Sequence, residues 1–195
     1  MTVKTYTATI TGTAGLIQHR FGEAAEGDVK AQTRLIGDNR GTPREEAEKV
    51  CYRYPNGTLY HPGAAFARLL REAGANHKVK GSRRSVKFSI PSAVIVVEDT
   101  VSLFHPETGE PLTDFEVDSR PVVIPATKGR VMRHRPRCDK WAATFHLEID
   151  DDLLPVAFIQ QLLEEGGRKL GIGDFRPEKG GPFGRFAITS WSNGR

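Results

Sequence analysis

The order of two hydrophobic patterns along the chain is the strongest constraint on its fold. Four segments show the alternation or apolar content of β-strands: residues 3–11, 86–97, 141–149 and 184–191. Two segments repeat apolar residues at helical spacing: residues 62–74 and about 153–169. The resulting order is strand, helix, strand, strand, helix, strand. We therefore predict an α+β chain with a ferredoxin-like or RRM-like β-α-β-β-α-β core.

Two long segments interrupt this order, at about residues 18–60 and about 98–140. A chain of 195 residues suits one domain better than two. We therefore predict a single domain over residues 1–195 with two large insertions. The first insertion contains a helix start at Thr42-Pro43 and a hairpin signal at Asn56-Gly57. Connections this long are usually functional or disordered, so the insertions are candidates for carrying function.

Composition and motifs exclude several classes of protein. No apolar run approaches the roughly 18 residues of a membrane span, and the N-terminus lacks the apolar core of a signal peptide. We therefore expect a cytoplasmic protein with no membrane partner. The two cysteines and six histidines are scattered, and no HExxH or GxSxG motif is present. No metal and no cofactor are expected.

Positive charge is concentrated in two runs, although the net charge is only +4. Residues 76–87 hold five Lys or Arg and no acid, and residues 128–140 hold six with one acid, Asp139. Acidic residues gather elsewhere, so we expect a molecule with basic and acidic sides. This polarity favours a polyanionic partner. The simple alternative is that the basic runs are solvated loops without a partner.

A glycine-rich stretch, "GIGDFRPEKGGPFGR" at residues 171–185, follows a predicted helix and precedes a predicted strand. Nucleotide-binding loops place their glycines before a helix, so this stretch does not match them. It is either a backbone cradle for phosphates, assisted by its three cationic side chains, or a structural turn. If it is a cradle, valine at Gly181 or Gly184 is expected to harm binding more than stability.

The pattern G-x-G-x-x-R-P-x-x-G-G-x-F-G-R-F in this stretch resembles the glycine-rich loop of the RAMP superfamily of CRISPR proteins. The order of elements and the opening "TATITGTAGLIQHR" are similar to those of its Cas-seven-like backbone subunits. The resemblance implies an antiviral-defence role in which protomers bind single-stranded nucleic acid, usually crRNA, and assemble head to tail into a helical filament. Other CRISPR effector subunits are then possible partners, and a solitary or phage-borne relative is equally compatible.

The basic runs, the glycine-rich stretch and the resemblance together define the candidate contacts to single-stranded RNA or DNA. They are His19, Arg20, Lys80, Arg83, Arg84, Lys128, Arg130, Arg133, Arg135, Arg137, Gly173, Arg176, Lys179, Gly181, Gly184 and Arg185. Either the hairpin at Asn56-Gly57 or the arm around residues 130–137 is expected to insert between bases. Alanine at the four arginines of the arm is expected to weaken binding and leave the fold intact. The threonine-rich first strand lacks the aromatic residues that stack bases on an RRM sheet.

Three alternatives remain open. A RAMP-type, metal-independent endoribonuclease would use His19 as the general base for a 2′-OH, with a nearby cation stabilising the phosphorane. Asp28 and Asp38 could instead support metal-dependent cleavage. A protein-only scaffold or mimic would use the acidic segments to bind other subunits. Salt dependence distinguishes nucleic-acid binding from the last alternative, because phosphate contacts lose affinity log-linearly with salt.

Overall fold

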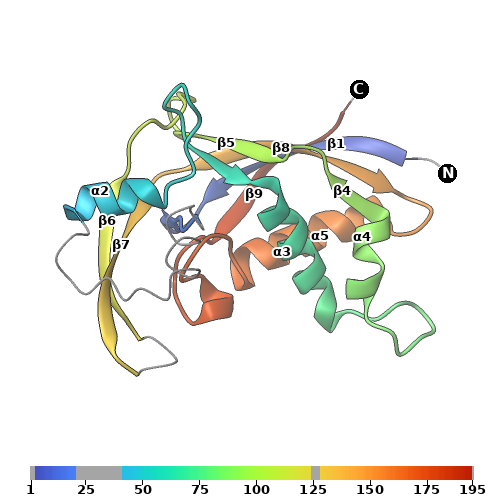
Figure 1. The fold of residues 1–195 in the computed structure, drawn as a ribbon. Helices are drawn as coiled ribbons and strands as arrows, with labels where there is room; N and C mark the ends of the chain where they lie inside the picture. Colours follow the sequence, from blue (N-terminus) through green and yellow to red (C-terminus); the bar gives the residue numbers. More distant parts are fainter. Residues whose placement is uncertain (1–2, 21–40, 124–127, 195) are drawn as a thin grey trace.

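The computed structural model describes residues 3–20, 41–123 and 128–194, which form two antiparallel sheets and several helices (Figure 1). The predicted α+β class is confirmed. The larger sheet has the order β3-β5-β8-β1-β9, and β4 also pairs with β8. Its strands are β1 (Val3–Gly12), β3 (Tyr60–Pro62), β4 (Val94–Val96), β5 (Thr100–Phe104), β8 (Ala142–Asp150) and β9 (Phe186–Asn193).

The alternation read from the sequence decides which face of β1 and β8 is buried. The two strands pair antiparallel with Ala8 opposite Phe145, and both of these side chains are fully buried. The intervening threonines lie on the other face, where the Thr9 and Thr144 hydroxyls are hydrogen-bonded at 2.9 Å. The strands predicted at 3–11, 141–149 and 184–191 are therefore confirmed, with ends shifted by no more than two residues.

Helices α3 (Gly63–Ala73) and α5 (Val156–Lys169) lie on the same side of the larger sheet (Figure 1). The Phe66 ring stacks on Phe145 with centroids 4.5 Å apart, which fixes α3 to the sheet. At Gly166 of α5 a Cβ atom would lie 2.4 Å from the Leu69 side chain, so glycine allows the two helices to approach closely. Both predicted helices are confirmed. Of the helices within the described ranges, none is long and apolar enough to cross a membrane.

The strand predicted over residues 86–97 is wrong for most of its length. Val86–Phe88 forms the short 3-10 helix η2, Ile90–Ala93 forms the single turn α4, and only β4 is a strand. Pro91 explains the difference. It lacks an amide hydrogen, and in the first turn of a helix that hydrogen has no intrahelical acceptor, so α4 accommodates it at no cost in hydrogen bonds.

The hairpin predicted at Asn56-Gly57 is reduced to its turn. The amide of Gly57 donates to Tyr54 O at 2.9 Å, and Gly57 has φ of +90°, which suits glycine. The flanking residues form a single bridge, between Arg53 and Leu59, rather than a two-stranded ribbon.

The smaller sheet has the order β2-β7-β6 and projects from the larger one (Figure 1). It contains β2 (Leu16–Ile17), β6 (Glu116–Val123) and β7 (Arg130–Cys138). Strands β6 and β7 form a regular antiparallel pair, which we call the arm hairpin. Helix α2 (Pro43–Lys49) packs against it. Thr42 caps α2 through a capping box with Glu45, as its sequence predicts.

Candidate functional site

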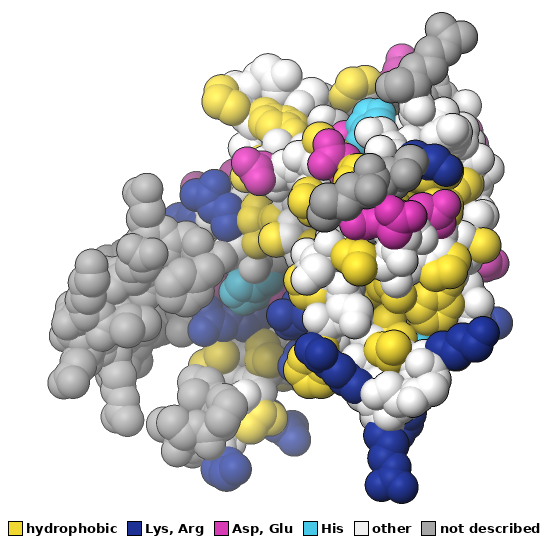
Figure 2. Space-filling model, turned by 90° about the vertical axis from the view of Figure 1, so that its right-hand side faces the viewer, with side chains coloured by type: hydrophobic (Ala, Val, Ile, Leu, Met, Phe, Trp, Pro, Cys, Tyr) yellow, Lys and Arg dark blue, Asp and Glu magenta, His cyan; other side chains and the backbone are white. Residues whose placement is uncertain are grey.

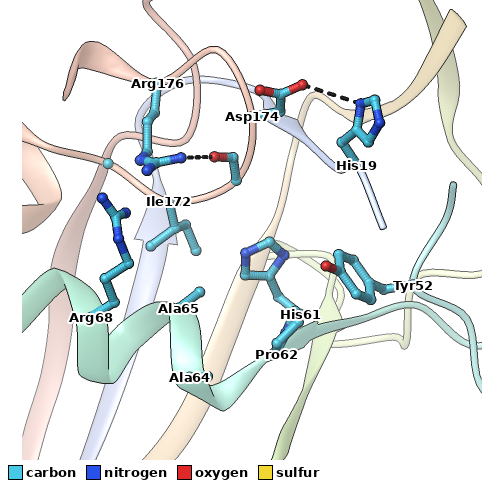
Figure 3. A pocket seen from close by; sticks show the side chains of 12 residues that line it. His19, Tyr52, His61, Pro62, Ala64, Ala65, Arg68, Ile172, Asp174 and Arg176 are labelled. Atoms are coloured by element: carbon cyan, nitrogen blue, oxygen red, sulfur yellow. Dashed lines mark hydrogen bonds and ion pairs between the residues drawn. The ribbon is translucent and has the colours of Figure 1, made fainter. Parts of the chain in front are cut away.

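A cleft of about 630 Å³ lies between the glycine-rich loop, residues 171–185, and the beginning of α3 (Figure 3). Residues 171–174 and Arg176 form one wall, and the first turn of α3 with Arg68 forms another. His19, Tyr52 and His61 complete its lining. The cleft therefore gathers side chains from three segments that are far apart in the sequence.

Close packing of the loop on itself requires glycine at two positions, Gly181 and Gly184. Gly184 has φ of +69°, and a Cβ atom there would lie 1.8 Å from Ile172 O. At Gly181 a Cβ would lie 1.9 Å from Phe175 O. Valine at either position therefore damages the fold of the loop first, contrary to the expectation that it harms binding more than stability. Gly173, with φ of +76°, packs on Ile17 O in the same way.

A buried ion-pair network joins the loop to the arm hairpin. The Arg135 guanidinium donates to Asp174 at 2.6 Å and to Asp118 at 3.2 Å, and Arg135 is only 5% exposed. His19 Nδ1 lies 3.4 Å from the same Asp174 carboxylate. Hydrogen bonds from His19 first, and then from Arg135, hold the pKa of Asp174 well below its ordinary value, although burial opposes them.

This network corrects one expectation for the arm. Arg135 is buried and binds both Asp118 and Asp174, so its loss would remove a shared cation and leave these acids only Arg120 and His19. The expectation that the fold tolerates alanine at all four arginines of the arm does not hold for Arg135.

Arg120 was missed from the sequence, because it lies outside both basic runs. Its guanidinium carbon lies 4.6 Å from the centroid of the Phe183 ring and 5.3 Å from that of Phe175. Its Nε donates to Asp118 at 2.7 Å. These cation–π contacts place a residue of β6 directly over the glycine-rich loop. The aromatic residues that flank the loop's central turn were the available signal.

The remaining cations of the arm hairpin face outward. Lys128, Arg130 and Arg133 are exposed, whereas Arg137 is partly covered and forms a 2.7 Å ion pair with Asp139. A second cleft, of about 240 Å³, is lined by Arg133, by valines of the hairpin, and by His19 and Asp174. The last two residues also line the larger cleft, so the two clefts adjoin at His19 and Asp174.

The first basic run lies apart from this site. Lys80, Arg83 and Arg84 are exposed in the segment after α3, at the opposite end of the molecule from the arm hairpin (Figure 1). In the view of Figure 2, Lys and Arg side chains gather toward the bottom, and Asp and Glu side chains gather toward the top. The sequence therefore predicted the charge segregation, but the structure does not bring the two basic runs together.

The other predicted residues lie around the glycine-rich loop. Arg176 donates to Gly173 O at 2.6 Å and contacts Glu178 at 2.9 Å, so it braces the loop from inside. Lys179 and Arg185 are exposed on the loop, and Arg20 is partly exposed beside His19. His19 and Arg176 are thus brought to the large cleft, as is Gly173.

Two further residues of the cleft, His61 and Tyr52, were not among the predicted site residues. His61 is 3% exposed, and its Nδ1 has no hydrogen-bond partner among the described residues. Burial, and then the Arg176 charge, lowers the pKa of His61 to about 3, so its imidazole is neutral. Its ring meets Tyr52 edge-on with centroids 5.7 Å apart. The sequence offered only a helix start at this point, since His61 directly precedes Pro62 and α3.

Within the described residues, no group of three or more His, Cys, Asp and Glu side chains is placed to hold a metal ion. Asp28 and Asp38, the residues considered for metal-dependent cleavage, lie outside the described residues.

No family model and no curated protein matches this chain. Among solved structures, it is similar to a chain of type III-B Cmr-beta, determined by cryo-electron microscopy with cognate target RNA bound. The TM-score is 0.54 at 10% identity over 98% of this chain, which spans 60% of that one. It is also similar to Cmr6 from Pyrococcus furiosus, with a TM-score of 0.49 and 14% identity over 96% of this chain and 99% of that one. The first similarity shows that this chain shares its overall fold with that Cmr-beta chain.

Proposed function

We propose that this protein binds single-stranded nucleic acid, in particular RNA of a CRISPR-type effector complex, in the groove that the arm hairpin forms with the glycine-rich loop. The observation that carries the proposal is that the two clefts share His19 and Asp174 in their linings and are lined by the cationic side chains of Arg68, Arg133 and Arg176. The fold shared with a chain of an RNA-bound Cmr structure supports it. Lys and Arg contacts to phosphates supply affinity without sequence preference.

The architecture fits a single ferredoxin-like domain with two insertions. The pairing of β9 with β1, of β1 with β8 and of β8 with β4, with α3 between β1 and β4 and α5 between β8 and β9, supports a β-α-β-β-α-β core. In this proposal residues 18–60 supply α2, Tyr52 and the first residue of β3, the strand that contains His61. Residues 98–140 supply the arm hairpin. The core holds the glycine-rich loop, and the insertions build the opposite side of the groove.

The proposed contacts differ in role. Exposed or partly exposed cations bind the strand directly: Arg20, Lys128, Arg130, Arg133, Arg137, Lys179 and Arg185. Arg135, Arg176 and the glycines at 173, 181 and 184 position the loop on which the strand lies. Lys80, Arg83 and Arg84 form a separate contact for a longer strand or for a neighbouring protomer in a head-to-tail filament.

Direct binding tests this proposal. Nucleic acid that co-purifies with the protein is extracted, sized and sequenced, and labelled RNA and DNA oligonucleotides are then titrated at several salt concentrations. We expect binding with a log-linear loss of affinity as salt rises. If nothing co-purifies and no oligonucleotide binds at low salt, the proposal is wrong and the cations serve a protein partner, as in a scaffold or mimic.

One observation favours a second candidate function, metal-independent RNA cleavage. His19 Nδ1 lies 3.4 Å from the Asp174 carboxylate, so this acid can orient the ring with its opposite nitrogen available to act on a 2′-OH in the cleft. The test is cleavage of an RNA substrate in excess chelator, with a 2′-deoxy substitution at the cut site and with His19→Ala. Cleavage that persists in either control would exclude this chemistry.

A further inference from the structure

The first turn of α3 carries no compensating negative charge. Its N-cap is Pro62, which has no polar side chain to cap the helix, and the turn consists of Gly63, Ala64 and Ala65 with no acid. The Gly63 amide donates to Asp99 O at 2.8 Å, whereas those of Ala64 and Ala65 have no acceptor among the described residues. Both alanines line the large cleft. The positive end of an 11-residue helix therefore faces open space.

A second feature of the same cleft independently indicates a ligand. His61 projects its imidazole into the space between Arg68 and Tyr52 (Figure 3). It is 97% buried, yet Nδ1 meets no hydrogen-bond partner among the described residues. A buried polar atom without a partner costs free energy, and native proteins rarely leave one unpaired. A bound group with hydrogen-bonding oxygens would supply the missing partner.

The charges around this point favour an anion. Arg68 and Arg176 both reach the single carboxylate of Glu178, at 2.6 and 2.9 Å, which leaves one positive charge in excess at this rim of the cleft. The acid across the cleft, Asp174, is already paired with Arg135 and His19. Oxygen atoms carrying negative charge would therefore meet helix amides, a neutral imidazole and an uncompensated guanidinium.

We propose that the N-terminus of α3 and His61 form a subsite for one phosphate group of the bound nucleic acid. Helix N-termini are common phosphate sites, since their amides point at the ligand and the helix dipole favours negative charge. The group is either a phosphodiester within the strand or a monophosphate at its end. The cleft volume of about 630 Å³ falls within the roughly 300–1,000 Å³ of small-ligand sites, so it has room for a whole nucleotide. This inference rests on the proposed function.

The test places a carboxylate at the subsite without weakening the helix. Ala64→Glu adds an acid to the first turn of α3, where acids stabilise helices, so the fold is expected to persist. Ala67→Glu is the matched control, because Ala67 is also exposed, lies in the same helix one turn later, and does not line the large cleft. We expect Ala64→Glu to weaken binding of labelled single-stranded RNA at least tenfold relative to Ala67→Glu. Circular dichroism and the melting temperature check that both variants remain folded.

Oligonucleotides of one sequence, with and without a terminal phosphate, identify the source of the group. A gain in affinity from a 5′- or 3′-phosphate that Ala64→Glu abolishes assigns the subsite to a strand end. An equal loss for all oligonucleotides assigns it to an internal phosphodiester. Wild-type binding that Ala64→Glu leaves unchanged, or that both glutamate variants reduce equally, overturns the subsite and leaves the proposed function standing. Absence of binding by the wild-type protein overturns both.

Discussion

The two basic runs look alike in the sequence but differ in the folded protein. The first, at residues 76–87, leaves Lys80, Arg83 and Arg84 in solvent after α3. The second becomes strand β7, whose register sets each cation opposite a particular residue of β6. Arg137 faces Glu116 and Arg135 faces Asp118, whereas Arg133 faces another cation, Arg120. Cross-strand pairing therefore neutralises the base of the arm hairpin and leaves positive charge toward its tip.

The largest effect on stability is expected from removal of Arg135, the buried cation of the arm hairpin. Arg135→Ala removes the buried cation that Asp118 and Asp174 share and leaves them only Arg120 and His19, so we expect a loss of at most roughly 3–5 kcal/mol in the free energy of unfolding. Arg133→Ala, two residues away on the same face but exposed, should change it by less than about 0.5 kcal/mol. Urea unfolding of both variants measures the difference. Equal effects would mean that the two arginines have the same role.

The next largest effect on stability is expected in the glycine-rich loop, which Arg135 contacts through Asp174. Gly184→Ala is expected to cost roughly 2–4 kcal/mol, because it combines a left-handed backbone with a clash against Ile172 O. Gly180 also has a positive φ, of +78°, but a Cβ there meets nothing within 4 Å. Gly180→Ala should therefore cost only the left-handed strain of roughly 1–2 kcal/mol. Similar melting temperatures for the two variants would contradict the packing described for Gly184.

Matched triple variants sharpen the comparison between the two runs. Replacing Lys128, Arg130 and Arg133 by alanine removes the same charge as replacing Lys80, Arg83 and Arg84. If each lost cation contacted one phosphate, the slope of log affinity against log salt should become shallower by about 0.7 per contact. We expect the larger loss for the arm variant on short RNA, because the groove lies beside the arm. An unchanged slope in that variant would remove the arm from the interface.

A smaller effect is expected on the free energy of unfolding at low pH. Unfolded, the Asp174 carboxyl titrates near its ordinary pKa of 3.8, and in the folded protein His19 and Arg135 lower that pKa. Between the two values the unfolded chain binds more protons. The stabilisation is therefore complete above about pH 4 and is lost as the pH falls through the folded pKa, at no more than roughly 1.4 kcal/mol per pH unit.

Asp174→Asn should flatten this part of the stability profile between pH 5 and pH 2. Asp139→Asn is the control, because Asp139 is an exposed acid at the side of β7. Chemical unfolding at a series of pH values measures both. A wild-type profile retained by Asp174→Asn would show that other carboxylates cause the acid dependence.

Local patterns were sufficient for much of the fold. The alternation around Ala8 and Phe145 and the helical spacing in α3 and α5 each depend on neighbouring residues, so these elements could be predicted. The segment around Pro91 could not, because an apolar run with one proline fits a broken strand as well as two short helical turns followed by a strand. Here the tertiary packing of Val86 and Ile90 in the core selects the second arrangement.

The site was harder to predict, because its roles depend on contacts between distant residues. Arg135 meets Asp118 and Asp174, which lie 17 and 39 residues away, and nothing in the sequence around Arg135 indicates them. His61 was read only as a residue before a helix, since its burial depends on how β3 pairs with β5. Charge counting identified the arm as basic, but only the register shows which of its cations reach solvent.

The buried contacts at the base of the arm hairpin have a mechanical consequence. From Arg135 to Arg130 the ribbon continues for roughly 17 Å, at about 3.4 Å per residue. An isolated two-stranded ribbon is only marginally stable in water. The arm is therefore held at its base, where Arg135 and Arg120 bind Asp118, and along its side by α2, which packs against β7. Because Arg135 also binds Asp174, which contacts His19, we expect a displacement at the base of the arm to alter the position of His19 in the cleft.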